Sequence, residues 1–182
     1  TVGWAEVAAG IDDPAADGAA LKCESDFVGG ATVPYGAYGA VVEVDTDTGA
    51  VTLQRLVTVD DAGTVINPMI VFGQVHGGVG QGIGQAMYEE FAYDDDGNPQ
   101  TSTFLDYMFP SAAEMPSFEC QITQSASPNN PLGAKGIAES GTIGAVPAVQ
   151  NAVVDALAAR GVRHVDVPLT PQRVWTALQA VS

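Results

Sequence analysis

The most constraining feature of the sequence is a stretch without any charged side chain, residues 62–88, which reads AGTVINPMIVFGQVHGGVGQGIGQAMY. It is not a membrane span, because Asn67, Gln74 and Gln81 interrupt any run of 18 apolar residues. Asn67 and Pro68 form a suitable cap and first position for a helix. Apolar side chains then recur every fourth residue, at Val71, Val75, Val79, Ile83 and Met87. The pattern predicts a largely buried helix that begins at Pro68.

Glycines form a second stripe on the same predicted helix. Four of them share one face, namely Gly73, Gly77, Gly80 and Gly84, and Gly78 and Gly82 add two more. Each glycine inside a helix costs about 1 kcal/mol relative to alanine, so something must compensate. One explanation is close packing against another backbone. The other is the approach of a ligand, for which four neutral or weakly basic side chains would supply polar edges: Gln74, His76, Gln81 and Gln85.

A second informative stretch is residues 127–150, SPNNPLGAKGIAESGTIGAVPAVQ. Lys135 and Glu139 are its only charged side chains, so we expect both to be partly buried, which is costly unless the charges are used. They could form a local ion pair worth a few tenths of a kcal/mol. Alternatively, Glu139 is a general base whose pKa burial would raise. Lys135 and the loop amides would then hold an anion near the start of the following helix.

The remaining pattern predicts an α+β fold of β-hairpins with packed helices. Strands are expected at 37–45 and 50–61 around a DTDTG turn, at 118–125, and in a second hairpin turning at 95–99. A helix should begin at Pro147 and end at Gly161, with Val149, Val153 and Leu157 buried, and another should follow the Thr170 cap. Residues 1–34 are predicted to be irregular and residues 35–182 to form the domain.

Composition excludes several functions. The chain has 22 acidic residues against 6 Lys and Arg, a formal net charge of -16. Nucleic-acid binding and attraction to anionic lipid both need a basic surface, so neither is expected. Cys23 and Cys120 have no metal-site spacing and predict free thiols in the cytoplasm. The start, TVGWAEVAAGIDDP, lacks both a signal-peptide pattern and an initiator methionine, so we expect it to lie within a longer protein or to follow processing.

The two stretches together resemble the molybdenum hydroxylases, the family of xanthine dehydrogenase, aldehyde oxidoreductase and aerobic carbon monoxide dehydrogenase. The similarity is carried by INPMIVFGQVHGGVGQGIGQAMYEE, by PNNPLGAKGIAESG, and by DYMFPSAAEMP between them. It runs from about Val33 to Leu178 and corresponds to the C-terminal part of the family's molybdopterin-binding region. Two long motifs in the same order make it specific.

The resemblance implies a site. Glu139 would be the base beside molybdenum, which the pterin rather than a protein ligand holds. The cofactor, a molybdopterin dinucleotide of the cytosine form, would be lined by Gln74, His76, Gly77, Gly78, Gln81 and Gly82. Lys135, Gly136 and Ile137 would approach it from the other side.

The resemblance also implies partners. Iron–sulfur and flavin groups would lie on partner subunits, and the family's substrates are small molecules. The family's large subunit is several times longer, and its substrate-shaping and copper-binding loops have no counterpart here. The isolated chain is therefore expected to be inactive and to expose an apolar surface where the remainder packs. The alternative is a cofactor-binding or structural assembly fragment without chemistry of its own.

Overall fold

A computed structural model describes residues 1, 3–9, 24–26 and 28–181. These residues fall into two units, 1–30 and 31–182. The first contains α1 (Trp4–Ala9), a short helix within a segment that was predicted to be irregular. The Glu6 carboxylate accepts a hydrogen bond from the Gly3 N–H at 2.9 Å, and this local contact favours the first turn. Cys23 lies outside the described residues.

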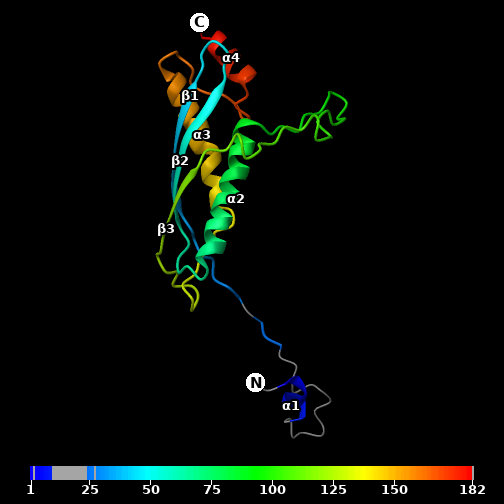
Figure 1. Ribbon diagram of the computed structural model, residues 1–182, viewed down its shortest axis with the longest axis vertical. Coiled ribbons are helices and arrows are strands. Elements are labelled where there is room, and N and C mark those ends of the chain that lie inside the picture. The colour runs from blue at the N-terminus through cyan, green and yellow to red at the C-terminus, as the bar shows by residue number, and fades with distance from the viewer. Residues whose placement is uncertain (2, 10–23, 27, 182) are drawn as a thin grey trace. The chain divides into compact units, whose positions relative to one another are not determined.

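The second unit is built on a three-stranded sheet in the order β1-β2-β3 (Figure 1). β1 (Gly36–Val44) and β2 (Val51–Asp61) form the predicted antiparallel hairpin. Its turn uses Gly49 at φ +75°, and the Asp45 carboxylate accepts the Asp47 N–H at 2.8 Å. β3 (Phe118–Thr123) is the third predicted strand and runs parallel to β2. The sheet therefore brings two distant parts of the chain side by side.

The second predicted hairpin is wrong, because only a single bridge between Tyr93 and Pro99 forms there. The turn chemistry is nevertheless present. The Asp94 carboxylate accepts hydrogen bonds from the Asp96 and Asn98 N–H groups at 3.0 and 2.8 Å. The Asp94 and Gln100 N–H groups also donate to the Asn98 and Ala92 carbonyls at 3.0 and 2.8 Å, but the pairing does not continue beyond them into strands.

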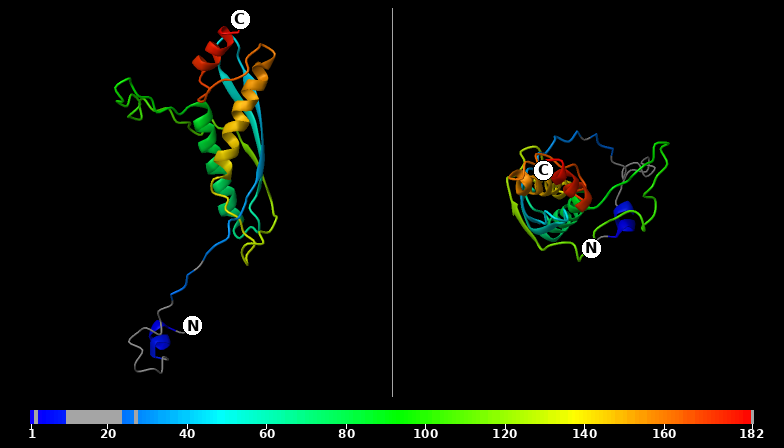
Figure 2. Two further views of the ribbon diagram at one scale, coloured as in Figure 1. Left: turned by 180° about the vertical axis from the view of Figure 1, so that it is seen from behind. Right: turned by 90° about the horizontal axis from the view of Figure 1, so that it is seen from above.

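Two helices, α2 (Pro68–Met87) and α3 (Ser140–Ala158), lie side by side against one face of the sheet (Figures 1 and 2). The apolar stripe predicted for α2 is confirmed, since all five of its residues are buried. All of them except Val71 belong to the hydrophobic core, together with residues of α3 and β2 that include Val149, Val153, Leu157, Leu53 and Leu56. Among the helices that the structure describes, none has the length and hydropathy that crossing a bilayer requires.

α3 begins seven residues before the predicted start, so Pro147 lies inside the helix rather than in its first turn. An interior proline costs about 3 kcal/mol. The earlier start buries Gly141 and Ala145 against α2, and this packing offsets the cost. The other predicted boundaries hold. Gly161 follows the helix at φ +93°. Thr170 caps α4 (Pro171–Gln179) by accepting the Arg173 N–H at 3.4 Å.

Candidate functional site

Two glycines of α2, Gly78 and Gly82, serve helix packing. Both are buried. A methyl group on Gly78 would lie 3.0 Å from the Thr142 backbone nitrogen, and one on Gly82 would lie 2.8 Å from the Ala145 Cβ. Close approach to α3 therefore explains these two residues, for which the family resemblance implies a place in the cofactor lining.

Three other glycines of α2 have a different environment. Around Gly73, Gly77 and Gly80, nothing lies within 4 Å of the position that a Cβ would occupy. Gly84 differs from them, because Glu89 and Pro110 cover it. We call Gly73, Gly77 and Gly80 the open glycine face. Helix packing therefore explains Gly78 and Gly82, whereas the open glycine face has no packing partner among the described residues.

The glutamines border the open glycine face on the side of α3. Gln74 and Gln81 are exposed and lie seven residues apart, on the same side of the helix. The Oε1 of Gln81 is 3.5 Å from the Thr142 hydroxyl, which donates a hydrogen bond to the Gly78 carbonyl at 3.0 Å. Gln81 thus stands where α2 meets the first turn of α3.

His76 points to a different side of α2. Two residues correspond to about 200° around a helix, so His76 is separated from Gln74 by the open glycine face. Its ring centroid is 6.4 Å from that of Phe72 and 6.0 Å from that of Phe118 in β3. The structure therefore does not gather the predicted lining residues on one surface.

Glu139 stands at the N-cap position of α3, and its side chain makes no capping hydrogen bond. The side chain is exposed, so its predicted burial is wrong within this chain. Two residues further on, Gly141 packs directly on the backbone of α2, where a methyl group would lie 2.6 Å from the Val75 carbonyl oxygen. This contact brings the loop of Glu139 beside the middle of α2.

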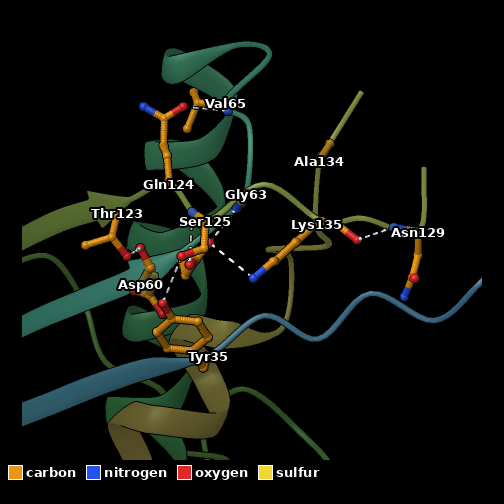
Figure 3. Close-up of polar contacts among 12 residues, drawn as sticks. Tyr35, Asp60, Gly63, Val65, Thr123, Gln124, Ser125, Asn129, Ala134 and Lys135 are labelled. Atoms are coloured by element: carbon orange, nitrogen blue, oxygen red, sulfur yellow. Dashed lines mark hydrogen bonds and ion pairs between the residues drawn. The ribbon is translucent and has the colours of Figure 1, made fainter. Parts of the chain in front are cut away.

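Lys135 does pair with a carboxylate, but not with Glu139. Its Nζ lies 3.5 Å from Oδ1 of Asp61, and its side chain is 10% exposed against 0% for Asp61. The ammonium also lies 5.1 Å from the centroid of the Tyr35 ring. Predicted burial is confirmed for Lys135. The local pair with Glu139, one of the two alternatives, does not form. Lys135 pairs with the end of β2 instead, and the loop folds back on the sheet (Figure 3).

The other two loop residues differ in exposure. Gly136 is exposed, with nothing within 4 Å of a Cβ position. Ile137 is partly buried and packs against the hydrophobic core. Only Gly136 therefore presents its backbone freely, and the Ile137 side chain helps to fix the loop.

Asp61 is a site residue that neither the local sequence pattern nor the family motifs indicate. Burial alone would raise its pKa, but hydrogen bonds from the Gly63 N–H, the Tyr35 side chain and Ser125 outweigh burial and lower the pKa to about 2. The sequence feature that could have indicated it is the pair of adjacent acids, Asp60 and Asp61, at the end of an apolar strand. Its partner, however, is distant in sequence.

The neighbouring acid, Asp60, has the opposite environment. Burial raises its pKa, although the hydrogen bond from Tyr38 acts against the shift. The Tyr38 hydroxyl donates to Asp60 Oδ1 at 2.6 Å, while Oδ2 is buried without a partner. Successive residues of a strand point to opposite faces, so the two acids meet different surroundings and their pKa values shift in opposite directions.

The charged state of Asp61 predicts a pH dependence of stability. Its folded pKa is below the ordinary 3.8, so its contribution is fully present above that value and is lost as the pH falls toward 2. A shift of this size corresponds to about 2 kcal/mol. We expect urea unfolding to show a stability advantage of wild type over Asp61→Asn that is about 2 kcal/mol smaller at pH 2 than at pH 6. An advantage independent of pH would contradict the charged state.

Comparison with known proteins identifies the family. The family model for the molybdopterin cofactor-binding domain matches residues 2–116. The carbon monoxide dehydrogenase large chain of Hydrogenophaga pseudoflava is 45% identical over 148 residues, which cover 81% of this chain and 18% of that protein. The 6-hydroxypseudooxynicotine dehydrogenase complex subunit gamma of Paenarthrobacter nicotinovorans is 45% identical over 150 residues, 82% of this chain and 19% of the relative.

Solved structures agree with the sequence relatives. The crystal structure of a Cu,Mo-CO dehydrogenase matches with a TM-score of 0.79 and 41% identity, over 81% of this chain and 19% of the other. Quinoline 2-oxidoreductase from Pseudomonas putida 86 matches with a TM-score of 0.74 and 44% identity, over 77% and 18%. The chain spans about a fifth of the length of these relatives. It belongs to the molybdenum hydroxylase family, as part of the molybdopterin cofactor-binding region found in carbon monoxide dehydrogenase large chains and xanthine dehydrogenases.

Proposed function

We propose that this chain forms one wall of the cofactor site of a molybdenum-dependent hydroxylase or dehydrogenase, and that the open glycine face of α2 lies against a molybdopterin dinucleotide of the cytosine form. The supporting observation is the open space at Gly73, Gly77 and Gly80. Each of these glycines costs α2 about 1 kcal/mol relative to alanine. Packing among the residues that the structure describes does not offset that cost, whereas the approach of a ligand to the bare backbone would.

Neutral groups are suited to hold such a cofactor in a chain with a net charge of -16. Gln74 and Gln81, beside the open glycine face, carry amides that both donate and accept hydrogen bonds. The exposed backbone of Gly136 and the first turn of α3, which lacks a side-chain cap, add further N–H donors. His76 would contact the cofactor only beyond the other edge of the open glycine face, toward β3.

We assign the proton-transfer role to Glu139. When bound, the molybdenum cofactor supplies two-electron redox chemistry. Glu139 would accept the proton that the reaction releases, at a carboxylate oxygen, because it is exposed beside the middle of α2 and is held by no cap. Lys135 would act indirectly, since its ammonium is engaged by Asp61 rather than directed at an anion.

The remainder of the large subunit would complete the site, and iron–sulfur and flavin subunits would carry electrons to and from it, in the cytoplasm. An exposed apolar segment supports such a partner. Figure 1 shows that the chain between α2 and β3 extends away from the sheet and helices. Phe104 is 86% and Leu105 97% exposed there, with Phe91, Met108 and Phe109 also exposed. Apolar surface of this kind marks an interface. The substrate would be a small molecule that enters between this chain and the remainder of the large subunit.

Substituting one glycine of the open face should separate stability from cofactor binding. We expect Gly77→Ala to stabilise the chain by about 1 kcal/mol in urea unfolding, because alanine favours the helix and nothing occupies the Cβ position. The same methyl group should lower the cofactor content of the assembled enzyme at least about tenfold, which corresponds to roughly 1.4 kcal/mol of lost binding.

The matched control is Gly39→Ala in β1, where a Cβ also meets nothing within 4 Å. It should leave the cofactor content unchanged. Molybdenum and released pterin dinucleotide, measured after purification, are the readouts. A Gly77→Ala enzyme that retains its full cofactor content would favour the alternative of a structural assembly fragment.

A further inference from the structure

Three segments that border the proposed site meet at the end of β2. They are residues 62–66, which lead into α2, residues 124–127 after β3, and residues 133–139, which lead into α3. Backbone hydrogen bonds link the first and third segments, from Thr64 N–H to the Gly133 carbonyl at 2.9 Å and from Lys135 N–H to the Ala62 carbonyl at 3.0 Å. The second segment contributes Gln124, whose Oε1 accepts the Val65 N–H at 3.0 Å (Figure 3).

One carboxylate contacts all three segments. Oδ1 of Asp61 accepts the Gly63 N–H at 2.6 Å, and both oxygens of Asp61 lie 3.2 Å from the Ser125 backbone nitrogen. The same Oδ1 lies 3.5 Å from the Lys135 ammonium, and the carboxylate is fully buried. A buried charge with several charge-assisted hydrogen bonds fixes the positions of its partners strongly, because no water can replace any of them cheaply.

We propose that Asp61 is a positioning residue, whose buried carboxylate holds loop 133–139 against the start of α2 and thereby sets where Glu139 stands beside the middle of α2. The consequence for Glu139 in catalysis rests on the proposed function, whereas the anchoring of the loop does not. Tyr35 completes the arrangement, since its carbonyl accepts the Asp61 N–H at 2.8 Å and its ring lies under the Lys135 ammonium.

Hydrogen exchange of the full 182-residue chain, followed by mass spectrometry, tests the proposal without any cofactor. In Asp61→Asn, which keeps the shape but removes the charge, amides of 62–66, 124–127 and 133–139 should exchange at least about tenfold faster. The amides of Val149–Leu157 in α3 should keep their protection. The matched control is Glu119→Gln, which removes an exposed carboxylate paired with Arg55 and should change none of these segments.

Variants of Lys135 give an independent readout. Lys135→Met should accelerate exchange in 133–139, and Lys135→Arg, which keeps the charge, should restore protection there. Equal acceleration along the whole chain, α3 included, would show that Asp61 contributes only to global stability and would overturn the proposal, as would no acceleration at all. If Asp61→Asn does not fold, the comparison of Lys135→Met with Lys135→Arg tests the proposal by the same criteria.

The experiments distinguish failure of the proposed function from failure of the positioning role of Asp61. Glu139→Gln with normal turnover would leave the exchange pattern of the Asp61 and Lys135 variants unaffected. Conversely, normal exchange in those variants would remove the positioning role while leaving the assignment of Glu139 intact.

Discussion

Replacing Glu139 with glutamine is expected to lower the turnover of the assembled enzyme by about 10²- to 10⁴-fold, the usual contribution of a positioned general base. Glutamine keeps the size and the hydrogen-bonding reach of the side chain but cannot accept a proton from a reacting group. Because the Glu139 side chain is exposed and makes no capping bond to α3, the substitution removes no contact that the fold needs. Stability should therefore change by less than about 0.5 kcal/mol.

The measurement is steady-state turnover with cofactor content determined on the same preparation, so that loss of chemistry is separated from loss of cofactor. Glu119→Gln serves as the control, because it also neutralises one exposed glutamate but lies in β3 and pairs with Arg55. Turnover of Glu139→Gln near that of wild type would remove Glu139 from the mechanism.

Gly141→Ala is expected to destabilise the chain by about 3 kcal/mol, at the upper end of the range for overpacked interiors. A methyl group there would lie 2.6 Å from the Val75 carbonyl oxygen and 2.7 Å from the Val79 nitrogen. Both atoms belong to the backbone of α2, which cannot rotate away as a side chain would. Relief requires α2 and α3 to move apart, and such a movement opens the core between them.

Urea unfolding provides the measurement, and Gly77→Ala provides the comparison, since it adds the same methyl group to a helix at a position with open space. The two variants should shift stability in opposite directions. A Gly141→Ala chain within 0.5 kcal/mol of wild type would show that the two helices do not meet at this point.

The helices show which structural features can be predicted from local sequence patterns and which cannot. The α2 helix was predictable because its cap, its first-position proline and its four-residue apolar spacing are all local. The start of α3 was not, because Pro147 is a strong local signal for a helix start. The early turn of α3 exists because glycines on both helices allow their backbones to touch, and that contact is a property of the pair. The second hairpin failed for a related reason, since turn residues alone cannot make strands.

For the candidate site, sequence motifs identified the family and the segments but not their geometry. They pointed to α2 and to the loop of Lys135 and Glu139, and the comparisons confirm the family. They could not assign each glycine, because a residue without a side chain leaves no sign of whether its open side meets a helix or a ligand. Only packing separates Gly78 and Gly82 from the open glycine face.

The sequence by itself determined the acidic charge balance, the two motif-bearing stretches, and the elements that depend on neighbours a few residues apart. The tertiary structure alone decided which charges pair. The sequence left Lys135 either paired with Glu139, four residues away, or directed at an anion, yet it is held by Asp61 at the end of β2. Burial makes an unpaired charge costly, and the partner that satisfies it is set by which strand and loop the fold places together. The separation of two residues along the sequence does not indicate whether the fold places them together.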